Sequence, residues 1–507
     1  MKQFREKLVY TRLYMPIATL VMFLVLSCSK NDGPSYDTPT ISLGVEDVID
    51  AQVGTRVSVP ISFNAGGGAK SVVVFKNGGF LTEININADA TQYTYETEAL
   101  PGSLTEGEEL TYGFLVSNLD GTDSETVNLT IRAELYDKVI IGSATLYALD
   151  IPSDGIVAGG TIVKLIQGRN YYLDRSVTFD VGSEIHIEEG VHVYMDAEAT
   201  TPIDFIIGGE ANIVGTANAP IVFTSSNTLL SGSTPEAGDW NVFRIDGTGN
   251  GSDNGTVNYL RIEYAGDRAF RLSEVGSGTN LSHIQVFKAT TEGVMITKGD
   301  AHLKYIVATD CEGGSYRLGD DYSGMIQFAI AVSSEHFGEL DDFAIREQAK
   351  PVLANLTLLG PGKDLSNTHG IRIRATAEPK IYNTVVAQYP RRGVRVNPDD
   401  ADNNVVITDL NGPTVFAYSH VFDLNSQSFR DKAEAFEPEE ILDFHNSTDA
   451  IAGIGVADFV PDVEQASTFN PTTLGSFFTS APFVGAVRND AEDWTKGWVK
   501  NPDGSLR

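Results

Sequence analysis

Apolar and polar residues alternate with a period of two along much of the first third of the chain. The alternating runs include Val57–Phe63, Leu110–Val116 and Val127–Ala133, and turn residues such as Gly66-Gly67-Gly68 and Asp120-Gly121 separate them. Alternation of this kind is typical of β-strands that are buried on one face. The number and spacing of these short strands predict an immunoglobulin-like β-sandwich over residues 41–148. Such a module serves either as a spacer or as a binding domain.

The pattern changes from about Gly155 to Val406, where short apolar strands recur with turn residues between them. The runs that begin at Val257, Leu281, Ala301 and Gly324 are spaced by about 20–24 residues, a period that suits a β-solenoid whose turns stack on one another. Helical periodicity is almost absent, which disfavours a doubly wound α/β sheet. We therefore expect an all-β chain with a parallel β-helix over residues 149–425; a long pair of β-sandwiches is the structural alternative.

Residues 426–507 follow the predicted coil and contain few regular strand patterns. An open end of a coil exposes unpaired backbone groups, so something must cover it. We therefore expect this segment to cap the coil, with Trp494 and Trp498 packed on it. A surface tryptophan pair that binds a ligand is the alternative for these two residues.

The N-terminus has the pattern of a secretory signal over residues 1–27. Basic residues precede an apolar run, Met15–Leu26, which is shorter than the ~20 residues that a membrane-spanning helix needs. The run ends in Val25-Leu26-Ser27-Cys28, which resembles the lipobox of bacterial lipoproteins. The resemblance implies that the Cys28 thiol is acylated and that the protein is anchored in the outer membrane. Residues 28–40 are polar and contain Gly and Pro, as expected of a flexible tether. A plain signal peptide with an incidental cysteine is the alternative.

Charge and cysteine content exclude several classes of protein. The formal charge is −32, with 68 acidic and 36 basic residues, and this argues against a nucleic-acid partner, which would need clustered Lys and Arg. The same balance argues against binding anionic lipid through a basic face. The chain has 2 cysteines, too few for a disulfide-stapled scaffold or a four-cysteine zinc site. The sequence also has no GxSxG, HExxH or Walker motif to indicate a known catalytic machinery.

Three arginines are the main candidates for ligand binding. Arg372 and Arg374 alternate on one predicted strand, and Arg395 follows about one turn later. Guanidinium groups stacked on one face can hold acidic sugars through bidentate hydrogen bonds. The alternative is an ordinary solvated face that is neutralised by the chain's many carboxylates.

Tyrosines and aspartates supply weaker candidates. Tyr316 and Tyr322 are candidates for a platform on which sugar rings stack. Asp320 and Asp321 could contribute to an acidic patch beside them. We expect no cofactor. Calcium is the alternative, because the loop that contains Asp399, Asp400 and Asp402 offers oxygen ligands, and an ordinary solvated turn is the other interpretation of this loop.

Long stretches of the chain resemble one family of surface lipoproteins and secreted proteins from Bacteroidota. The resemblance rests on GTIVKLIQGRNYYLDRSVTFD from Gly160, VNYLRIEYAG from Val257, PVLANLTLLGP from Pro351 and the closing APFVGAVRNDAEDWTKGWVK from Ala481. It covers about Gly159 to Lys500 and implies a right-handed parallel β-helix of the pectate-lyase-like kind. The activity of the family is not settled, so the resemblance predicts fold and location more than function.

Together these patterns lead to two hypotheses about function. The first is a non-catalytic, outer-membrane lipoprotein that binds a polysaccharide or an outer-membrane protein such as a transporter; a purely structural adhesin is not separable from it by sequence. The second is a polysaccharide lyase or glycoside hydrolase that acts on the flank of the coil near Arg372, Arg374 and Arg395. An enzyme would need carboxylates or a base within ~3–6 Å of those arginines.

Overall fold

The computed structural model describes residues 36–335, 337, 340–363, 368–374, 376–397, 407, 409–425, 429–431 and 442–507. The named elements in these ranges are β-strands and three short 3₁₀-helices, η1 (Ser226–Leu229), η2 (Pro471–Leu474) and η3 (Asp490–Glu492). The prediction of an all-β fold is confirmed. Within the same ranges, no helix has the length and apolar character needed to cross a membrane. Contacts divide the chain into two compact units, which we describe separately.

The N-terminal strands form two sheets. The smaller sheet has the order β1 (Thr40–Leu43), β3 (Ser58–Asn64), β6 (Gln92–Glu96). The larger sheet has the order β2 (Val48–Gln52), β8 (Val127–Glu134), β7 (Glu109–Asn118), β4 (Ala69–Lys76), β5 (Gly79–Asn85). Strand β1 pairs antiparallel with β3, whereas β2 pairs parallel with β8. The alternation noted in the sequence corresponds to burial, because Val59, Ile61 and Phe63 are buried and the residues between them are exposed.

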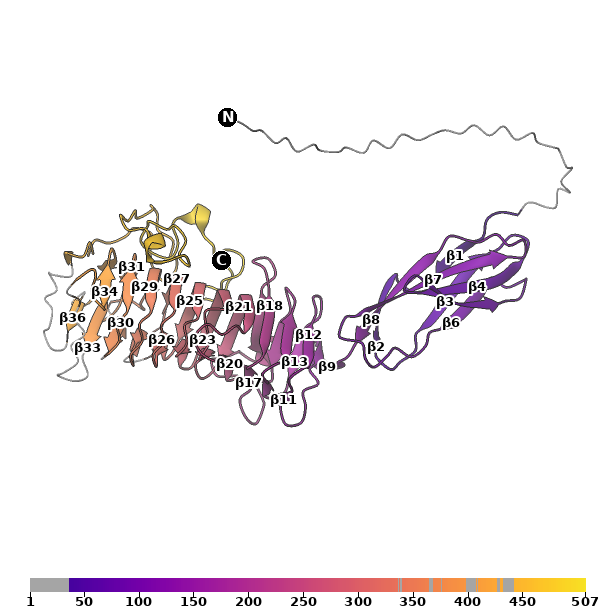
Figure 1. The fold of residues 1–507 in the computed structure, drawn as a ribbon, viewed down its shortest axis with the longest axis horizontal. Helices are drawn as coiled ribbons and strands as arrows, with labels where there is room; N and C mark the ends of the chain where they lie inside the picture. The colour runs from indigo at the N-terminus through magenta and orange to yellow at the C-terminus, as the bar shows by residue number, and fades with distance from the viewer. Residues whose placement is uncertain are drawn as a thin grey trace, which may run out of the picture. The chain divides into compact units, whose positions relative to one another are not determined.

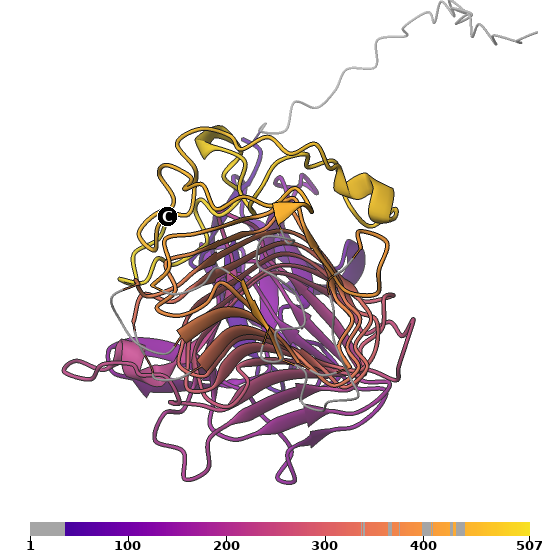
Figure 2. The ribbon, with the colours of Figure 1, turned by 90° about the vertical axis from the view of Figure 1, so that its left-hand side faces the viewer.

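From β9 onward the second unit is a coil of parallel strands, and each turn contributes to three faces (Figures 1 and 2). A short hairpin, β9 (Asp137–Ile141) with β10 (Ala144–Ala148), opens the coil, because β10 pairs in parallel with a strand of the next turn. Our sequence analysis placed these two strands in the N-terminal module. Their registry with the coil shows that the coil begins earlier than residue 149.

Face 1 and face 2 lie side by side along the coil. Face 1 starts with β12 (Ile162–Leu165), β15 (Glu184–Ile187) and β18 (Glu210–Val214), and face 2 with β10, β13 (Tyr171–Leu173), β16 (His192–Met195) and β19 (Ile221–Ser225). In the middle turns one long strand serves both faces: β21 (Gly255–Ala265), β23 (Asn280–Ala289), β25 (His302–Cys311), β27 (Met325–Val332) and β29 (Val352–Leu359). The last turns divide again into β31 (Lys380–Tyr382) and β34 (Val415–Ala417) on face 1, and β32 (Val385–Ala387) and β35 (His420–Phe422) on face 2.

Single residues with positive φ mark the bend between faces 1 and 2. Tyr259, His283 and Tyr305 have φ values of 50°, 53° and 60°, which is uncommon for residues other than glycine. Their rings stack on one another, with centroid distances of 4.2 Å for Tyr259–His283 and 4.4 Å for His283–Tyr305. The bend therefore repeats at the same place in successive turns and carries an aromatic stack along the coil.

Face 3 is a continuous parallel sheet. Its strands in order are β11 (Ile156–Val157), β14 (Val177–Phe179), β17 (Asp204–Ile207), β20 (Val242–Asp246), β22 (Phe270–Ser273), β24 (Glu292–Thr297), β26 (Gly314–Gly319), β28 (Leu340–Ile345), β30 (Thr368–Arg374), β33 (Val394–Asn397) and β36 (Phe429–Asp431). All three faces turn apolar side chains inward into one core, in which Phe205 and Phe243 stack at 5.3 Å. The predicted stacking of parallel turns is confirmed.

The C-terminal segment differs from the predicted cap. Residues 442–507 run back along the coil over face 2, the bend and part of face 1 instead of covering its end, and Figure 1 shows this segment in yellow above the middle turns. Trp498 is buried against the bend, with its ring 5.6 Å from Tyr259. Strand β36 pairs with β33, so the coil continues beyond residue 425. The physical reason for this path is that face 2 has outward apolar side chains that need cover.

Candidate functional site

Arginine recurs at one outward position of face 3. Arg244 is in register with Arg271 on the next turn, and Arg372 is in register with Arg395. Arg317 occupies the same position between these pairs. Each of these arginines stands between two buried apolar neighbours, as in Phe270-Arg271-Leu272, so its side chain must point outward. Because neighbouring turns lie ~4.8 Å apart, the six steps from Arg244 to Arg395 cover about 30 Å.

Carboxylates neutralise part of this arginine face. Asp341 accepts from Arg372 at 2.8 Å and lies 3.6 Å from Arg374. The other contacts are Arg244–Asp246 at 2.6 Å, Arg317–Glu292 at 3.3 Å, Arg317–Glu347 at 3.5 Å, and Arg268 with Asp267. The alternative reading of an arginine face balanced by carboxylates therefore holds for these members.

Two arginines of the face are different. Across the part of the chain that the structure describes, the side chains of Arg271 and Arg346 have no hydrogen-bond or ion-pair partner, and the Nε atom of each is buried. Burial lowers the pKa of Arg271, and the charges of Arg244 and Arg268 add to this effect. Burial likewise lowers the pKa of Arg346, followed by the charges of Arg374 and Arg317.

A partly buried cation that faces other cations is unfavourable unless an anion compensates it. Both residues remain charged at neutral pH because a guanidinium does not deprotonate in proteins. Arg271 and Arg346 therefore mark the places where an external anion would be held most strongly.

Acid–base groups beside the arginines are already engaged. Asp341 and His369 are in register on β28 and β30, and Arg395 Nη1 lies 3.4 Å from His369 Nε2. His369 is only 1% exposed, and burial lowers its pKa to about 4. The imidazole is inaccessible, and the carboxylate is already shared by two guanidiniums. They are poorly placed to take a proton from a sugar.

Tyr316 and Tyr322 do not form a sugar platform. Both rings lie in the core of the coil, where the Tyr316 hydroxyl donates to the carbonyl of Ile330 at 2.8 Å and the Tyr322 hydroxyl donates to that of Ala301 at 2.8 Å. The prediction that these two residues bind a ligand is incompatible with this burial. The reason is the strand alternation: Tyr316 precedes Arg317, which points outward, so the tyrosine must point inward.

Asp320 and Asp321 lie in the exposed turn after β26, with φ values of 50° and 66°. Their charges help to raise the pKa of Lys298, after its main partner Glu274. No group of three or more metal-ligating side chains occurs in the described ranges. Two predicted sites lie outside the described residues: the calcium loop of Asp399, Asp400 and Asp402, and the lipidation site Cys28. Both stay predictions.

Comparison with known proteins agrees with the coil. The family model described as a pectate-lyase-like beta helix domain matches residues 242–499, half of the chain. The chain belongs to this β-helix family. Comparison with curated proteins found no match. A solved structure described as "Structures of Clostridium thermocellum CbhA fibronectin(III)-like modules" is similar at 16% identity over 19% of this chain and 47% of that one, with a TM-score of 0.16. At that score the likeness supports no further conclusion.

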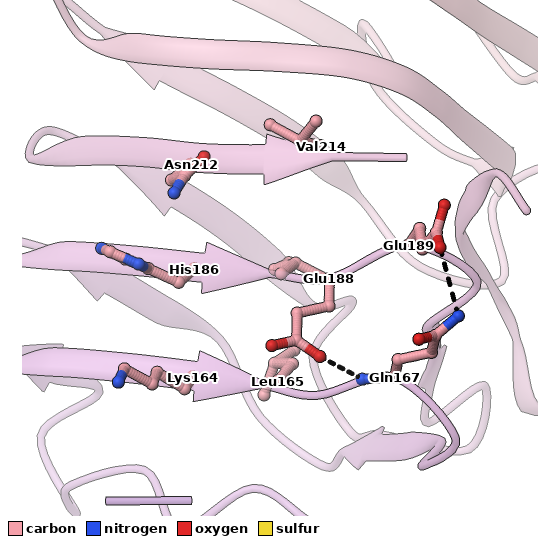
Figure 3. A pocket seen from close by; sticks show the side chains of 9 residues that line it. Lys164, Leu165, Gln167, His186, Glu188, Glu189, Asn212 and Val214 are labelled. Carbon is pink, nitrogen blue, oxygen red and sulfur yellow. Dashed lines mark hydrogen bonds between the residues drawn. The ribbon is translucent and has the colours of Figure 1, made fainter. Parts of the chain in front are cut away.

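This β-helix also has an open groove on face 1 of its early turns. The groove has a volume of about 570 Å³, and Figure 3 shows Lys164, His186 and Asn212 stacked on β12, β15 and β18 along one wall. On the other wall Glu188 accepts from the Gln167 amide at 2.8 Å, and Glu189 accepts from its side chain at 3.3 Å. Charges of both signs mix here and the carboxylates already have partners, so the groove is a weaker candidate than face 3.

Sequence reasoning missed Arg244, Arg271, Arg317 and Arg346 as members of the arginine face. A signal was present: the triplets Phe-Arg-Ile, Phe-Arg-Leu, Tyr-Arg-Leu, Ile-Arg-Ile and Val-Arg-Val each place one arginine between two inward apolar residues. A search of the β-helix for an arginine between two such apolar residues finds Arg244, Arg271, Arg317 and Arg395 in addition to Arg372.

Proposed function

We propose that this protein is a non-catalytic binding module that holds an acidic polysaccharide along face 3. The observation that carries the proposal is a ladder of arginines in register on a sheet of a chain whose formal charge is −32. One step of the coil is comparable in length to one sugar unit, so an extended acidic chain can meet several guanidiniums in succession. Several weak contacts on one polymer add to a firm attachment.

The proposal includes the location inferred from the N-terminus. Residues 1–27 act as the signal, Cys28 carries lipid in the outer membrane, residues 28–40 form a tether, and an immunoglobulin-like module in residues 41–148 spaces the coil from the membrane. The lipobox-like sequence supports the anchor. The parallel pairing of β2 with β8, next to antiparallel β1–β3, supports the immunoglobulin-like assignment. An outer-membrane protein such as a transporter is the alternative partner.

A polysaccharide lyase or glycoside hydrolase is the second candidate function. The observation that favours it is the juxtaposition of Asp341, His369 and Arg395 on adjacent turns. The burial of His369 and the double engagement of Asp341 favour binding instead. Residues 426–507, predicted as a cap, take part in neither proposal.

Titration of the mature chain with acidic and neutral polysaccharides of similar length tests the proposal. We expect binding to acidic chains only, with an affinity that falls as salt rises, because salt screens surface charges. The double variant Arg271→Ala/Arg346→Ala should bind at least tenfold more weakly. Arg175→Ala, which removes an exposed arginine paired with Asp174, should bind like the wild type.

Two results would overturn this reading. Equal binding of neutral and acidic chains would remove the role of the arginine face. Appearance of unsaturated sugars or new reducing ends during the titration would replace binding with catalysis.

The anchor has its own test. Cys28→Ala should release the protein from the membrane fraction of the cells that produce it, whereas the neighbouring Ser29→Ala should not. Retention of the Cys28→Ala variant in membranes would rule out lipidation as the anchor.

A further inference from the structure

Four arginines of face 3 converge around one small residue, Ala344. Arg317 lies one turn before Ala344 and Arg372 one turn after it, in the same register position. Arg346 follows Ala344 by two residues along the chain, and Arg374 follows Arg372 in the same way. The Ala344 side chain ends at its methyl group and is 2% exposed. It therefore forms the floor of a site whose walls are guanidinium groups.

The charges around this floor do not cancel. Asp341 is shared between Arg372 and Arg374, and Glu292 and Glu347 contact Arg317. The Arg346 side chain has no hydrogen bond or ion pair in the described part of the chain. Burial and the charges of Arg374 and Arg317 lower its pKa, and the more distant carboxylates of Asp341 and Glu347 act in the opposite direction. The four guanidiniums thus carry one more positive charge than the three carboxylates balance.

A glycine makes room for Glu347 at the edge of the site. Gly319 precedes Arg346 by one turn, and a Cβ at this position would lie 2.6 Å from Glu347 Oε2. Any larger residue would therefore push Glu347 out of place. Glu347 forms the rim, and its negative charge works against an anion that binds beside Arg346.

We propose that Arg317, Arg346, Arg372 and Arg374 form a site for one tetrahedral oxyanion, a sulfate ester carried by the polysaccharide. This proposal rests on the proposed function and names the chemical class of its ligand. A carboxylate offers two oxygens in one plane, which a single bidentate guanidinium can satisfy. A sulfate ester presents three terminal oxygens in different directions, so it can accept from several guanidiniums that approach from adjacent turns. Its charge also persists at acidic pH.

The first test uses inorganic sulfate and needs no polysaccharide. The thermal midpoint of the mature protein is measured in sodium sulfate and in sodium chloride of equal ionic strength. Sulfate stabilises proteins in general through exclusion from their surface. The part of the midpoint shift that is specific to the site is therefore the part that is lost in Arg346→Ala and retained in Arg175→Ala. Glu347→Gln should enlarge it. An identical sulfate shift in the wild type and in Arg346→Ala would overturn the site. A matching shift with inorganic phosphate would show that any tetrahedral oxyanion fits.

The second test compares a sulfated oligosaccharide, a phosphorylated one and a uronic-acid oligosaccharide of equal length and charge. We expect the sulfated chain to bind the wild type at least tenfold more tightly than the uronic-acid chain, and Arg346→Ala to remove this preference. Arg346→Lys keeps the positive charge but lacks the planar set of hydrogen-bond donors, so it should retain only part of the preference for the sulfated chain.

The outcomes separate the two proposals. Equal affinity for sulfated and uronic-acid chains, or tighter binding of the phosphorylated chain, overturns the sulfate-ester assignment but leaves the proposed function standing. Binding of none of the chains, with the specific sulfate shift intact, overturns the proposed function but leaves an oxyanion site at Arg346.

Discussion

Faces 2 and 3 of the coil are built alike inside and differ outside. Both turn apolar residues into the shared core at alternate positions. On face 2 the C-terminal segment covers the outward residues, both the apolar Val307 and Ile330, which are buried with Trp498, and the ion-paired Arg261 and Glu263. On face 3 arginine stands at one outward position in five of the seven turns from β20 to β33. Because the core is similar behind both faces, the outward residues determine whether a face packs against another part of the chain or is available to a ligand.

Polar side chains sharpen this contrast. At the bend beside face 2, Asn355 donates to the carbonyls of Ala481 at 3.2 Å and Phe483 at 2.7 Å, and Gln285 donates to the carbonyl of Lys500 at 2.8 Å. These groups are satisfied by the chain itself. Arg271 and Arg346 on face 3 are not, within the described residues. Buried polar groups are nearly always paired in native proteins. His283 Nδ1 at the bend is unpaired as well, but Arg271 and Arg346 are charged, so an external anion is the partner that they favour.

The largest expected effect is on face 2. Trp498→Ala removes a fully buried ring that packs on Tyr259 and His283, and we expect a loss of ~3–5 kcal/mol in the free energy of unfolding. Denaturant unfolding measures it. Phe80→Ala, at an exposed position of the N-terminal strands, serves as control and should change stability by less than ~0.5 kcal/mol. A loss below about 1 kcal/mol for Trp498→Ala would mean that the C-terminal segment does not cover face 2 in solution.

A second substitution removes hydrogen bonds from the same contact. Asn355→Leu leaves the carbonyl of Phe483 without its donor and removes one of the donors to the carbonyl of Ala481, which keeps Asn383, so we expect a loss of ~2–3 kcal/mol. Hydrogen exchange should become faster in residues 479–486, because the segment detaches locally. Asn411→Leu, at an exposed turn, is the matched control. Unchanged exchange in that range would contradict the role given to Asn355.

Lowering the pH should reduce the stability of the protein through His283, which lies in the bend beside face 2. Burial lowers the pKa of His283 to about 4, whereas an unfolded histidine has a pKa of ~6.5. Between these values the unfolded chain binds a proton that the folded chain does not, so stability falls as the pH drops from about 6.5 to about 4. We expect this histidine to contribute roughly 2 kcal/mol of that fall. His283→Phe keeps a ring in the stack, and its unfolding free energy should depend less on pH over that range. Identical profiles would show that His283 is not buried as described.

The smallest effect on stability should come from face 3. Arg271→Ala and Arg346→Ala remove unpaired cations that face other cations, so we expect stability to stay within ~0.5 kcal/mol of the wild type or to rise slightly. Arg169→Ala is the contrasting control, because Arg169 is buried with Glu106 and Asp50 and its loss should cost ~3 kcal/mol or more. A large loss in Arg346→Ala would make it a structural residue.

The repeat of alternating strands made the parallel coil predictable, because inward apolar positions recur about once per turn. The arginine face was only partly predictable. Arg372 and Arg395 are separated by one regular turn, but the distance along the chain from Arg244 to Arg271 and on to Arg317 varies with the loops between strands. Which arginines are neighbours in the sheet depends on the register of the strands. Loops of variable length make that register difficult to predict from the sequence.

The segment that covers face 2 was also only partly predictable from the sequence. The run Ile306-Val307-Ala308 is apolar at inward and outward positions alike, and this pattern is typical of a strand covered on both sides. It indicates that something covers the strand. It does not identify residues 442–507 as the cover, because that pairing joins segments nearly two hundred residues apart.

A crystal structure of the mature chain with a sulfated oligosaccharide tests the central claim most directly. The account predicts that the oligosaccharide lies along β20–β33 on face 3, with one sulfate group against Arg346 and its axis parallel to that of the coil. An oligosaccharide bound in the groove beside Lys164 and His186, with face 3 empty, would contradict it.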